Sequence, residues 1–144
     1  MYATVSLEAE VMAVLRDFAS AYANRDLEKL LAVFLPEPDV VLLGTGQDEK
    51  RLGLAGICEQ AERDWEQADT LHFRFGWRSV SCHGDVCWVA SDCFALVQAG
   101  YRQAEIPLRM TAVLVRSEND SLRIAQLHYS SPVMPEDESD TCLE

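Results

Sequence analysis

The first half of the chain alternates between short amphipathic segments and turn-forming residues. Apolar side chains recur at intervals of three and four over residues 7–22, which predicts a helix. Asp26 begins a second, shorter stripe that Pro36 prevents from continuing. A third helical stripe covers residues 54–65, after an apolar run at 40–43 that is typical of a strand. We therefore expect two helices paired as a hairpin, a short strand and a third helix.

From residue 70 onward the period of the pattern changes to two. Apolar and polar residues alternate in the first of these segments, whose apolar face consists of Leu71, Phe73, Phe75 and Trp77. Residues 86–98 are apolar on both faces, as in a central strand that is covered on both sides. Residues 106–116 and 122–131, joined by a polar turn, complete an antiparallel meander.

This order of elements predicts an α+β fold, in which a cone-shaped, strongly curved, mainly antiparallel sheet carries three N-terminal helices on its concave side. Helices cannot completely fill such a bent sheet, so we expect a pocket at the wide end. A chain of 144 residues has the usual size of one domain, which we place at residues 1–134. Residues 135–144 contain five acids and no base, which indicates an acidic flexible tail.

The net charge, the N-terminal residues and the cysteine content limit the partners and the location that we expect for this protein. The net charge of −12 opposes nucleic-acid binding. The N-terminus lacks the basic start of a secretory signal and no apolar run reaches the roughly 20 residues of a membrane span, so we predict a cytoplasmic protein with no membrane partner. An odd number of cysteines favours free thiols. A turn at residues 84–85 would place Cys82 opposite Cys87, so the alternative to free thiols is a redox pair or a metal site at this point. We predict that the protein binds no metal and no cofactor.

Three stretches carry a family resemblance: VLRDFASAYANRDLEKLLAVF, LLGTGQDEKRLGLAGI and LRMTAVLVRSENDSLRIAQLHYSSP. Over residues 7–132 the chain resembles the SnoaL-like branch of the nuclear transport factor 2-like superfamily. The resemblance implies a conical barrel with an internal pocket and, commonly, a homodimer formed through the outer face of the sheet. It implies no single chemistry, because the superfamily includes isomerases, cyclases, dehydratases and transport factors without catalysis. Phe18 stands where the ketosteroid isomerases carry a catalytic tyrosine, and residues 40–43 lack their carboxylate.

Two late-strand residues are the candidate catalytic groups. Asp92 lies among apolar residues, where burial raises the pKa of a carboxylate toward a value suited to proton transfer. The alternative is an Asp92 paired across strands with Arg74, Arg78 or Arg109. His128 is a candidate general base, or a hydrogen-bonded structural residue, because either Gln126 and His128 or Leu127 and Tyr129 can face inward.

Six further residues are candidate ligand contacts. Arg109 would select a carboxylate or enolate if it pointed into the pocket, and would otherwise meet solvent or the partner subunit. Asp48 and Glu49 lie either at the pocket rim or in a solvated turn before the third helix. Aromatic residues at core-compatible spacing complete the set: Tyr22, Trp65 and Trp77.

Two functions are consistent with these residues. One is a domain for dimerisation and for binding a small apolar or aromatic ligand in a largely apolar pocket. The other is an acid/base enzyme, an isomerase, polyketide-type cyclase or dehydratase, that acts on a small apolar or aromatic acid. The enzyme needs two polar groups converging within about 3 Å of one point. We expect such groups on the late strands and the Gly-Thr-Gly loop, because the inward stripes of the helices are apolar.

Overall fold

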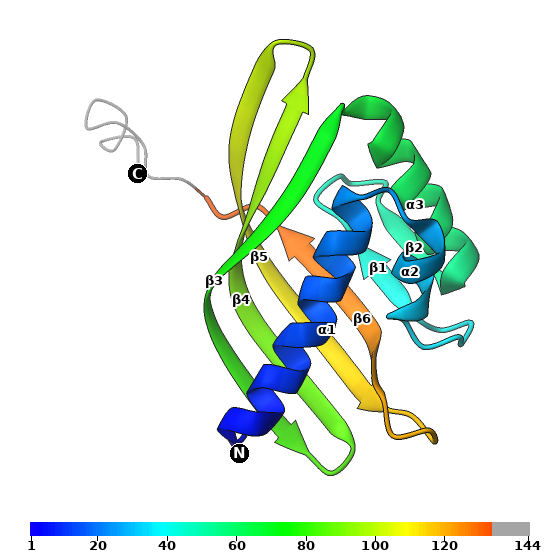
Figure 1. Ribbon diagram of the computed structural model, residues 1–144, viewed down its shortest axis with the longest axis vertical. Coiled ribbons are helices and arrows are strands. Elements are labelled where there is room, and N and C mark those ends of the chain that lie inside the picture. Colours follow the sequence, from blue (N-terminus) through cyan, green and yellow to red (C-terminus); the bar gives the residue numbers. More distant parts are fainter. Residues whose placement is uncertain (134–144) are drawn as a thin grey trace.

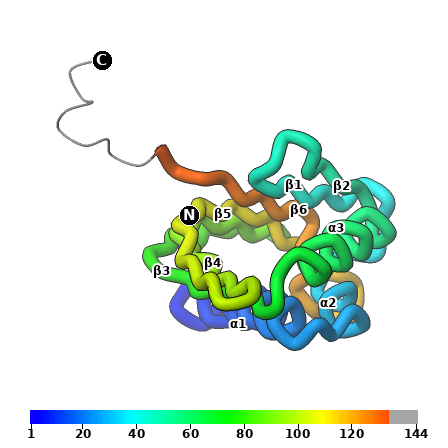
Figure 2. The backbone as a smooth tube through the Cα atoms, turned by 90° about the horizontal axis from the view of Figure 1, so that it is seen from above, coloured from blue at the N-terminus to red at the C-terminus, as the bar shows by residue number. Residues whose placement is uncertain are grey.

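Three helices pack on one side of a curved six-stranded sheet in the computed structural model, which describes residues 1–133 (Figures 1 and 2). The helices are α1 (Val5–Ala23), α2 (Leu27–Ala32) and α3 (Gly53–Gln67). The strands are β1 (Val41–Leu43), β2 (Lys50–Leu52), β3 (Thr70–His83), β4 (Val86–Ala99), β5 (Arg102–Arg116) and β6 (Leu122–Ser130). The predicted α+β architecture is confirmed; the predicted tail at 135–144 lies outside the described residues.

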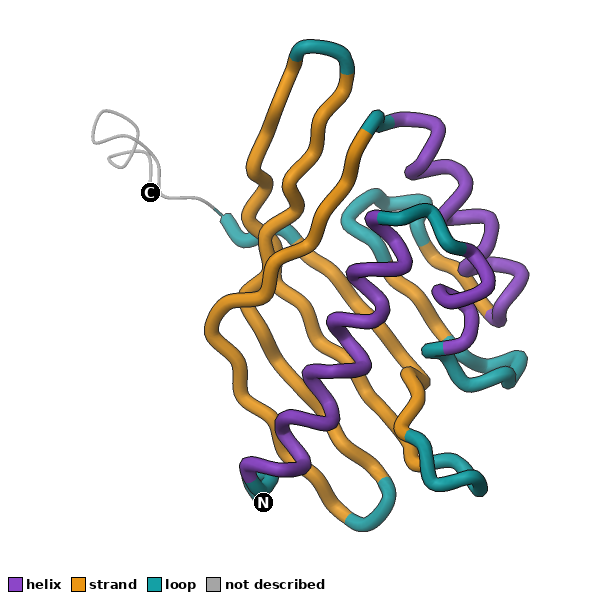
Figure 3. Tube along the Cα trace, viewed as in Figure 1, coloured by secondary structure: helices purple, strands orange, loops and turns teal. Residues whose placement is uncertain are grey.

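The sheet follows the order β2-β1-β6-β5-β4-β3. Its long strands form the antiparallel meander that the alternating pattern predicted, and β1 joins β6 in parallel. The hairpin between β4 and β5 extends past the helices at one end of the molecule (Figure 3). Helices α1 and α3 lie on the concave side of the sheet (Figure 1).

The inward faces of the strands and helices form one core. Its largest completely buried side chains come from every layer: Phe18, Phe34, Met12, Leu15, Leu30, Ile57, Met110, Leu114, Ile124 and Leu127. Leu127 and Tyr129 of β6 face this core, which settles the choice that the sequence left open for the last strand.

A β-bulge in β3 corrects one predicted face. The register of β3 on β4 shifts between Phe75 and Arg78, so an extra residue enters β3 and the alternation of side chains changes parity. Trp77 therefore lies on the outer face and is 64% exposed, although it continues the alternation of Phe73 and Phe75. Arg78 instead points toward α1, where its Nε lies 3.6 Å from a carboxylate oxygen of Glu8.

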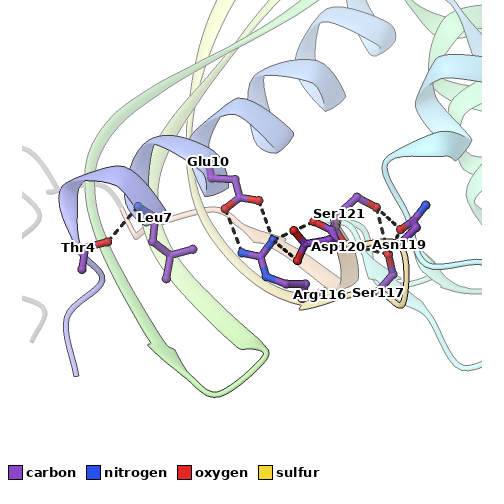
Figure 4. A network of polar contacts seen from close by, with 8 residues as sticks. All are labelled: Thr4, Leu7, Glu10, Arg116, Ser117, Asn119, Asp120 and Ser121. Carbon is purple, nitrogen blue, oxygen red and sulfur yellow. Dashed lines mark hydrogen bonds and ion pairs between the residues drawn. The ribbon is translucent and has the colours of Figure 1, made fainter.

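An ion pair joins the start of α1 to the turn that follows β5 (Figure 4). Thr4 caps the helix by accepting a hydrogen bond from the backbone N–H of Leu7 at 3.1 Å. One turn further, Glu10 accepts two hydrogen bonds of 2.9 Å from the Arg116 guanidinium, which also donates to the backbone carbonyl of Asp120 at 3.0 Å. This contact joins the first half of α1 to the end of β5.

The described cysteines are free thiols, and Cys82 lies directly opposite Cys87, as the turn at 84–85 predicted.

None of the three helices in residues 1–133 combines the length and the apolar character that crossing a membrane requires.

Candidate functional site

A cavity of about 390 Å³ lies between the concave face of the sheet and helices α1 and α3. Its wall is mainly apolar and draws on α1, the loop between β1 and β2, α3 and strands β3 to β6. Four aromatic side chains supply much of the surface: Phe18, Tyr22, Phe73 and Tyr129. Such a wall suits a small apolar or aromatic molecule.

The aromatic side chains of the cavity wall pack against one another. Tyr129 stacks on Phe73, with ring centroids 5.5 Å apart and an interplanar angle of 15°. Tyr22 meets the same Phe73 ring at 5.5 Å and 70°, in an edge-on arrangement. Phe18 contacts both tyrosine rings, at 5.4 Å and 6.4 Å. The two phenols are thus held by rings that are themselves packed.

A network of hydrogen bonds joins the polar side chains at the α3 side of the cavity. The Tyr22 hydroxyl donates to Asp64 Oδ2. Gln60 Nε2 donates to both carboxylates, to Asp64 Oδ1 at 3.0 Å and to Glu49 Oε1 at 3.1 Å. Gln60 Oε1 accepts from Arg51 Nε at 3.0 Å, so every polar atom of this amide, which is only 4% exposed, has a partner. The amide thereby holds two carboxylates at the same wall.

The spacing along α3 explains why this helix supplies the polar groups. Gln60 and Asp64 are one turn apart, so they share a face of the helix. That face also carries the buried residues Ile57 and Ala61. The sequence predicted helix stripes that are mainly apolar and almost free of inward charge, and α3 departs from this prediction through Gln60 and Asp64.

The Gly-Thr-Gly loop positions the second carboxylate. The backbone N–H of Gly46 donates to Glu49 Oε2 at 2.5 Å. A Cβ atom on Gly44 would lie 2.5 Å from the same oxygen and 3.0 Å from Glu49 Cβ, closer than side chains tolerate. The glycines therefore let the loop fold tightly around the Glu49 side chain, which lines the cavity.

Burial raises the pKa of three ionisable groups in the cavity wall, Asp64, Tyr22 and Tyr129. It is the largest cause that raises the pKa of Asp64, and the charge of Glu49 raises it further, while hydrogen bonds from Tyr22 and Gln60 act in the opposite direction. Burial also raises the pKa of Tyr22, with the charge of Asp64 as the next cause. Burial likewise raises the pKa of Tyr129 well above its ordinary value. Both phenols are thus protonated hydrogen-bond donors at neutral pH.

Tyr129 differs from Tyr22 in having no partner for its hydroxyl. Its Oη is buried and makes no hydrogen bond within the described chain, although the residue lines the cavity and is only 7% exposed. A buried polar atom without a partner is uncommon in folded proteins and calls for an explanation, such as a catalytic role or a bound water.

Comparison with known proteins identifies the family. The model of the SnoaL-like domain family matches residues 11–134. The chain belongs to this family. No curated protein shows a significant sequence match.

Solved structures place this SnoaL-like domain in the nuclear transport factor 2-like fold. A superfamily protein from Salmonella enterica has a TM-score of 0.81 at 14% identity, with 94% of this chain and 98% of that chain covered. A candidate dehydratase of the family from Streptomyces avermitilis has a TM-score of 0.80 at 18% identity, with 91% of this chain and 100% of that chain covered. A protein from Catenulispora acidiphila, in complex with S-DNPA, has a TM-score of 0.79 at 17% identity, with 98% of this chain and 100% of that chain covered. At these identities the similarity shows the fold alone.

Four of the predicted ligand contacts lie on the cavity side of this SnoaL-like domain. Tyr22 and Glu49 line the cavity itself. Trp65 lies behind Tyr22, with ring centroids 5.7 Å apart, and its Nε1 donates to the backbone carbonyl of Tyr22 at 2.9 Å. Asp48 lies beside the cavity without lining it and forms an exposed ion pair of 3.0 Å with Arg63. Of these four, two are wall residues, one supports the wall and one is peripheral.

The other predicted site residues lie on the opposite face of the sheet. Asp92 and Arg109 are exposed and directly opposite each other on β4 and β5, and His128 pairs with Thr111. They lie outside the cavity because each sits one position out of phase with the buried residues of its strand. Trp77 also lies outside it, because the bulge in β3 turns this residue to the outer face. On the late strands, Tyr129 lines the cavity, whereas Asp92, Arg109 and His128 do not.

No group of three His, Cys, Asp or Glu side chains within residues 1–133 is arranged to hold a metal ion. The chemistry that the cavity can perform with its own residues is proton transfer, by a carboxylate with a raised pKa, and hydrogen bonding, by two neutral phenols.

Proposed function

We propose that this protein is an acid/base enzyme that acts on a small, largely apolar or aromatic carbonyl compound bound in the cavity. The observation that carries the proposal is the Asp64 carboxylate, hydrogen-bonded to Tyr22 and Gln60 inside an aromatic-walled cavity. A binding domain without catalysis would not require a half-buried carboxylate whose pKa is raised. The raised pKa brings this group closer to neutrality, where a carboxylate accepts and returns protons most effectively.

The residues divide the proposed reaction between them. Asp64 accepts a proton from the carbon next to the carbonyl of the bound compound. The negative charge that develops on the carbonyl oxygen is stabilised by a hydrogen bond from Tyr129 Oη, which has no other partner. Asp64 then returns the proton to another carbon, which is an isomerisation, or to a departing hydroxyl group, which is a dehydration. Tyr22 and Gln60 are positioning residues that hold the carboxylate.

The fold is compatible with this chemistry and does not establish it. One structural relative is a candidate dehydratase, but at 18% identity this likeness supports the reaction class only by analogy.

Exchange of hydrogen for deuterium tests the proton transfer without knowledge of the natural substrate. The protein is incubated in D2O with a panel of small neutral ketones that carry an aromatic ring, including 2-tetralone, and loss of the signals from the hydrogens next to the carbonyl is followed by NMR. We expect Asp64→Asn to lower the rate by roughly 10²- to 10⁴-fold and Tyr129→Phe by about 10²- to 10³-fold. The wild-type rate should rise with pH as Asp64 loses its proton, at a pH above the usual aspartate range.

Asp48→Asn is the matched control, because it removes the same charge from a residue outside the cavity. It should keep the wild-type rate. An Asp64→Asn protein that exchanges as fast as the wild type, or a wild type that accelerates no member of the panel, would contradict the proposal.

A further inference from the structure

Glu49 is a charged group of the cavity that the proposed reaction does not use. It lines the wall, and the tight Gly-Thr-Gly loop holds its carboxylate in place. Within residues 1–133, Glu49 takes part in no ion pair; the neighbouring cation Arg63 bonds to Asp48, and Arg51 bonds to Gln60 and Glu59. The wall contains no Lys, Arg or His among its described residues. Within the described residues no cation bonds directly to Glu49, and Arg63, which is bonded to Asp48, acts on its charge only through space.

The two carboxylates of the cavity also retain hydrogen-bonding capacity. Each oxygen of Glu49 and Asp64 accepts one hydrogen bond, from Gly46, Gln60 or Tyr22. A carboxylate oxygen has two lone pairs, so each can accept a second. A ligand group that brings several donors and a positive charge satisfies both the charge and the free lone pairs.

The remaining wall is suited to the same kind of ligand. The stacked and edge-on rings of Phe18, Tyr22, Phe73 and Tyr129 offer π surfaces, which attract cations as well as flat apolar groups. Independently of the carboxylates, the unpartnered hydroxyl of Tyr129 points to an occupant with a hydrogen-bonding oxygen. The cavity thus presents two different polar contacts within one aromatic enclosure.

We infer that the substrate carries a protonated amine, which binds to Glu49, on an aromatic or alicyclic body whose oxygen reaches Tyr129. This inference rests on the proposed function, since it names the substrate class of the same cavity. It reverses the sign of charge that the sequence predicted: with Arg109 on the outer face, the wall offers no cation to an acid. An amine is attracted by Glu49, whereas a carboxylic acid is repelled by both Glu49 and Asp64.

Three probes that share one bicyclic body separate the effect of the ligand's charge from that of its shape. 2-Aminotetralin is a cation at pH 7, 2-tetralol is neutral, and 1,2,3,4-tetrahydro-2-naphthoic acid is an anion, all on one bicyclic body. Binding to the full-length protein is measured by isothermal titration calorimetry. Because a hydrogen bond to a charged partner contributes about 1.5–3 kcal/mol, the amine should bind roughly 10- to 100-fold more tightly than the alcohol, and the acid most weakly.

The variants assign this preference to one residue. Glu49→Gln should remove most of the difference between amine and alcohol, while Asp48→Asn, which removes the adjacent charge outside the cavity, should keep it. Circular dichroism melting shows whether Glu49→Gln is folded, and the wild-type ranking of the probes is informative without any variant.

Several outcomes overturn the inference. They are an alcohol or acid that binds as tightly as the amine, an amine that does not bind at millimolar concentration, or an Asp48→Asn variant that loses the preference as fully as Glu49→Gln. If ketone exchange still depends on Asp64 while the amine shows no preference, the amine inference alone fails. If both signals are absent, the proposed function fails with it.

Discussion

Replacing Tyr129 with phenylalanine should make the protein more stable and less active. The substitution removes one buried oxygen that has no hydrogen-bond partner in the described chain. The phenylalanine ring keeps the stack on Phe73, whose centroid is 5.5 Å away, and the contact with Phe18. The change is therefore confined to the hydroxyl group.

The size of the effect follows from the environment of that hydroxyl. A buried polar group without a partner costs about 1–3 kcal/mol of stability. Because Tyr129 lines the cavity as well as the core, we take the lower end and expect the free energy of unfolding to rise by about 1 kcal/mol. Tyr22→Phe is the matched comparison, since it removes a hydroxyl that donates to the Asp64 carboxylate. It should lower the free energy of unfolding by about 1.5–3 kcal/mol.

Urea denaturation measures both changes, with the midpoint and slope compared among wild type, Tyr129→Phe and Tyr22→Phe. Opposite signs are expected for the two variants. If Tyr129→Phe destabilises the protein as much as Tyr22→Phe does, the Tyr129 hydroxyl has a partner in solution and the reasoning about a vacant donor is refuted. A more stable Tyr129→Phe variant with slower ketone exchange is the combination expected of a group that serves a reaction at a cost to folding.

Two further predictions concern the rest of the molecule. Glu10→Gln should lower the free energy of unfolding at pH 7 by less than about 1 kcal/mol, because its contact with Arg116 is partly exposed. The hydrogen bond from Arg116 lowers the pKa of Glu10 in the folded protein. The stabilisation is therefore present above the usual pKa of 4.5 and is lost as the pH falls through the lower pKa of the folded state. Urea denaturation at several pH values should show that the free energies of unfolding of wild type and Glu10→Gln converge in acid. We also propose that a second copy of the chain covers the outer face of the sheet, where Trp77 and Trp88 are 64% and 39% exposed. Sedimentation should give a dimer for wild type and a monomer for Trp88→Glu, and a wild-type monomer at micromolar concentration would contradict this proposal.

The elements that could be predicted from the sequence are those with a long, regular period. Helix α1 and strands β3 to β6 each repeat their pattern over nine residues or more, so a few irregular positions do not obscure it. Strand β2 was not predicted, because Lys50–Leu52 is short and mainly charged. It forms because Arg51 and its neighbours pair with β1, a contact that no local pattern records.

The faces of the strands were harder to predict than the strands themselves. Residues on both sides of β4 are apolar, so the pattern did not say which set faces the helices. A difference of one position moves Asp92 from the cavity to the outer surface. In β3 the bulge changes this parity within a single strand, and the sequence before Trp77 contains no sign of it except Gly76. The misplaced catalytic residues follow from this ambiguity of one residue.

The polar wall of the cavity was missed for a different reason, because the sequence does not show which groups would form hydrogen bonds with a buried amide. Ile57, Gln60, Ala61 and Asp64 are spaced as one inward face of α3, so the signal was a pair of polar residues at helical spacing inside an apolar stripe. Polar residues in such a stripe normally indicate solvent exposure, because burying an amide without partners is costly. Here the partners come from the loop and strand before the helix, where Arg51 donates to Gln60 and Glu49 accepts from it. The same contacts that make burial of the amide tolerable also bring two carboxylates to one wall, so the fold and the candidate site depend on a single set of hydrogen bonds.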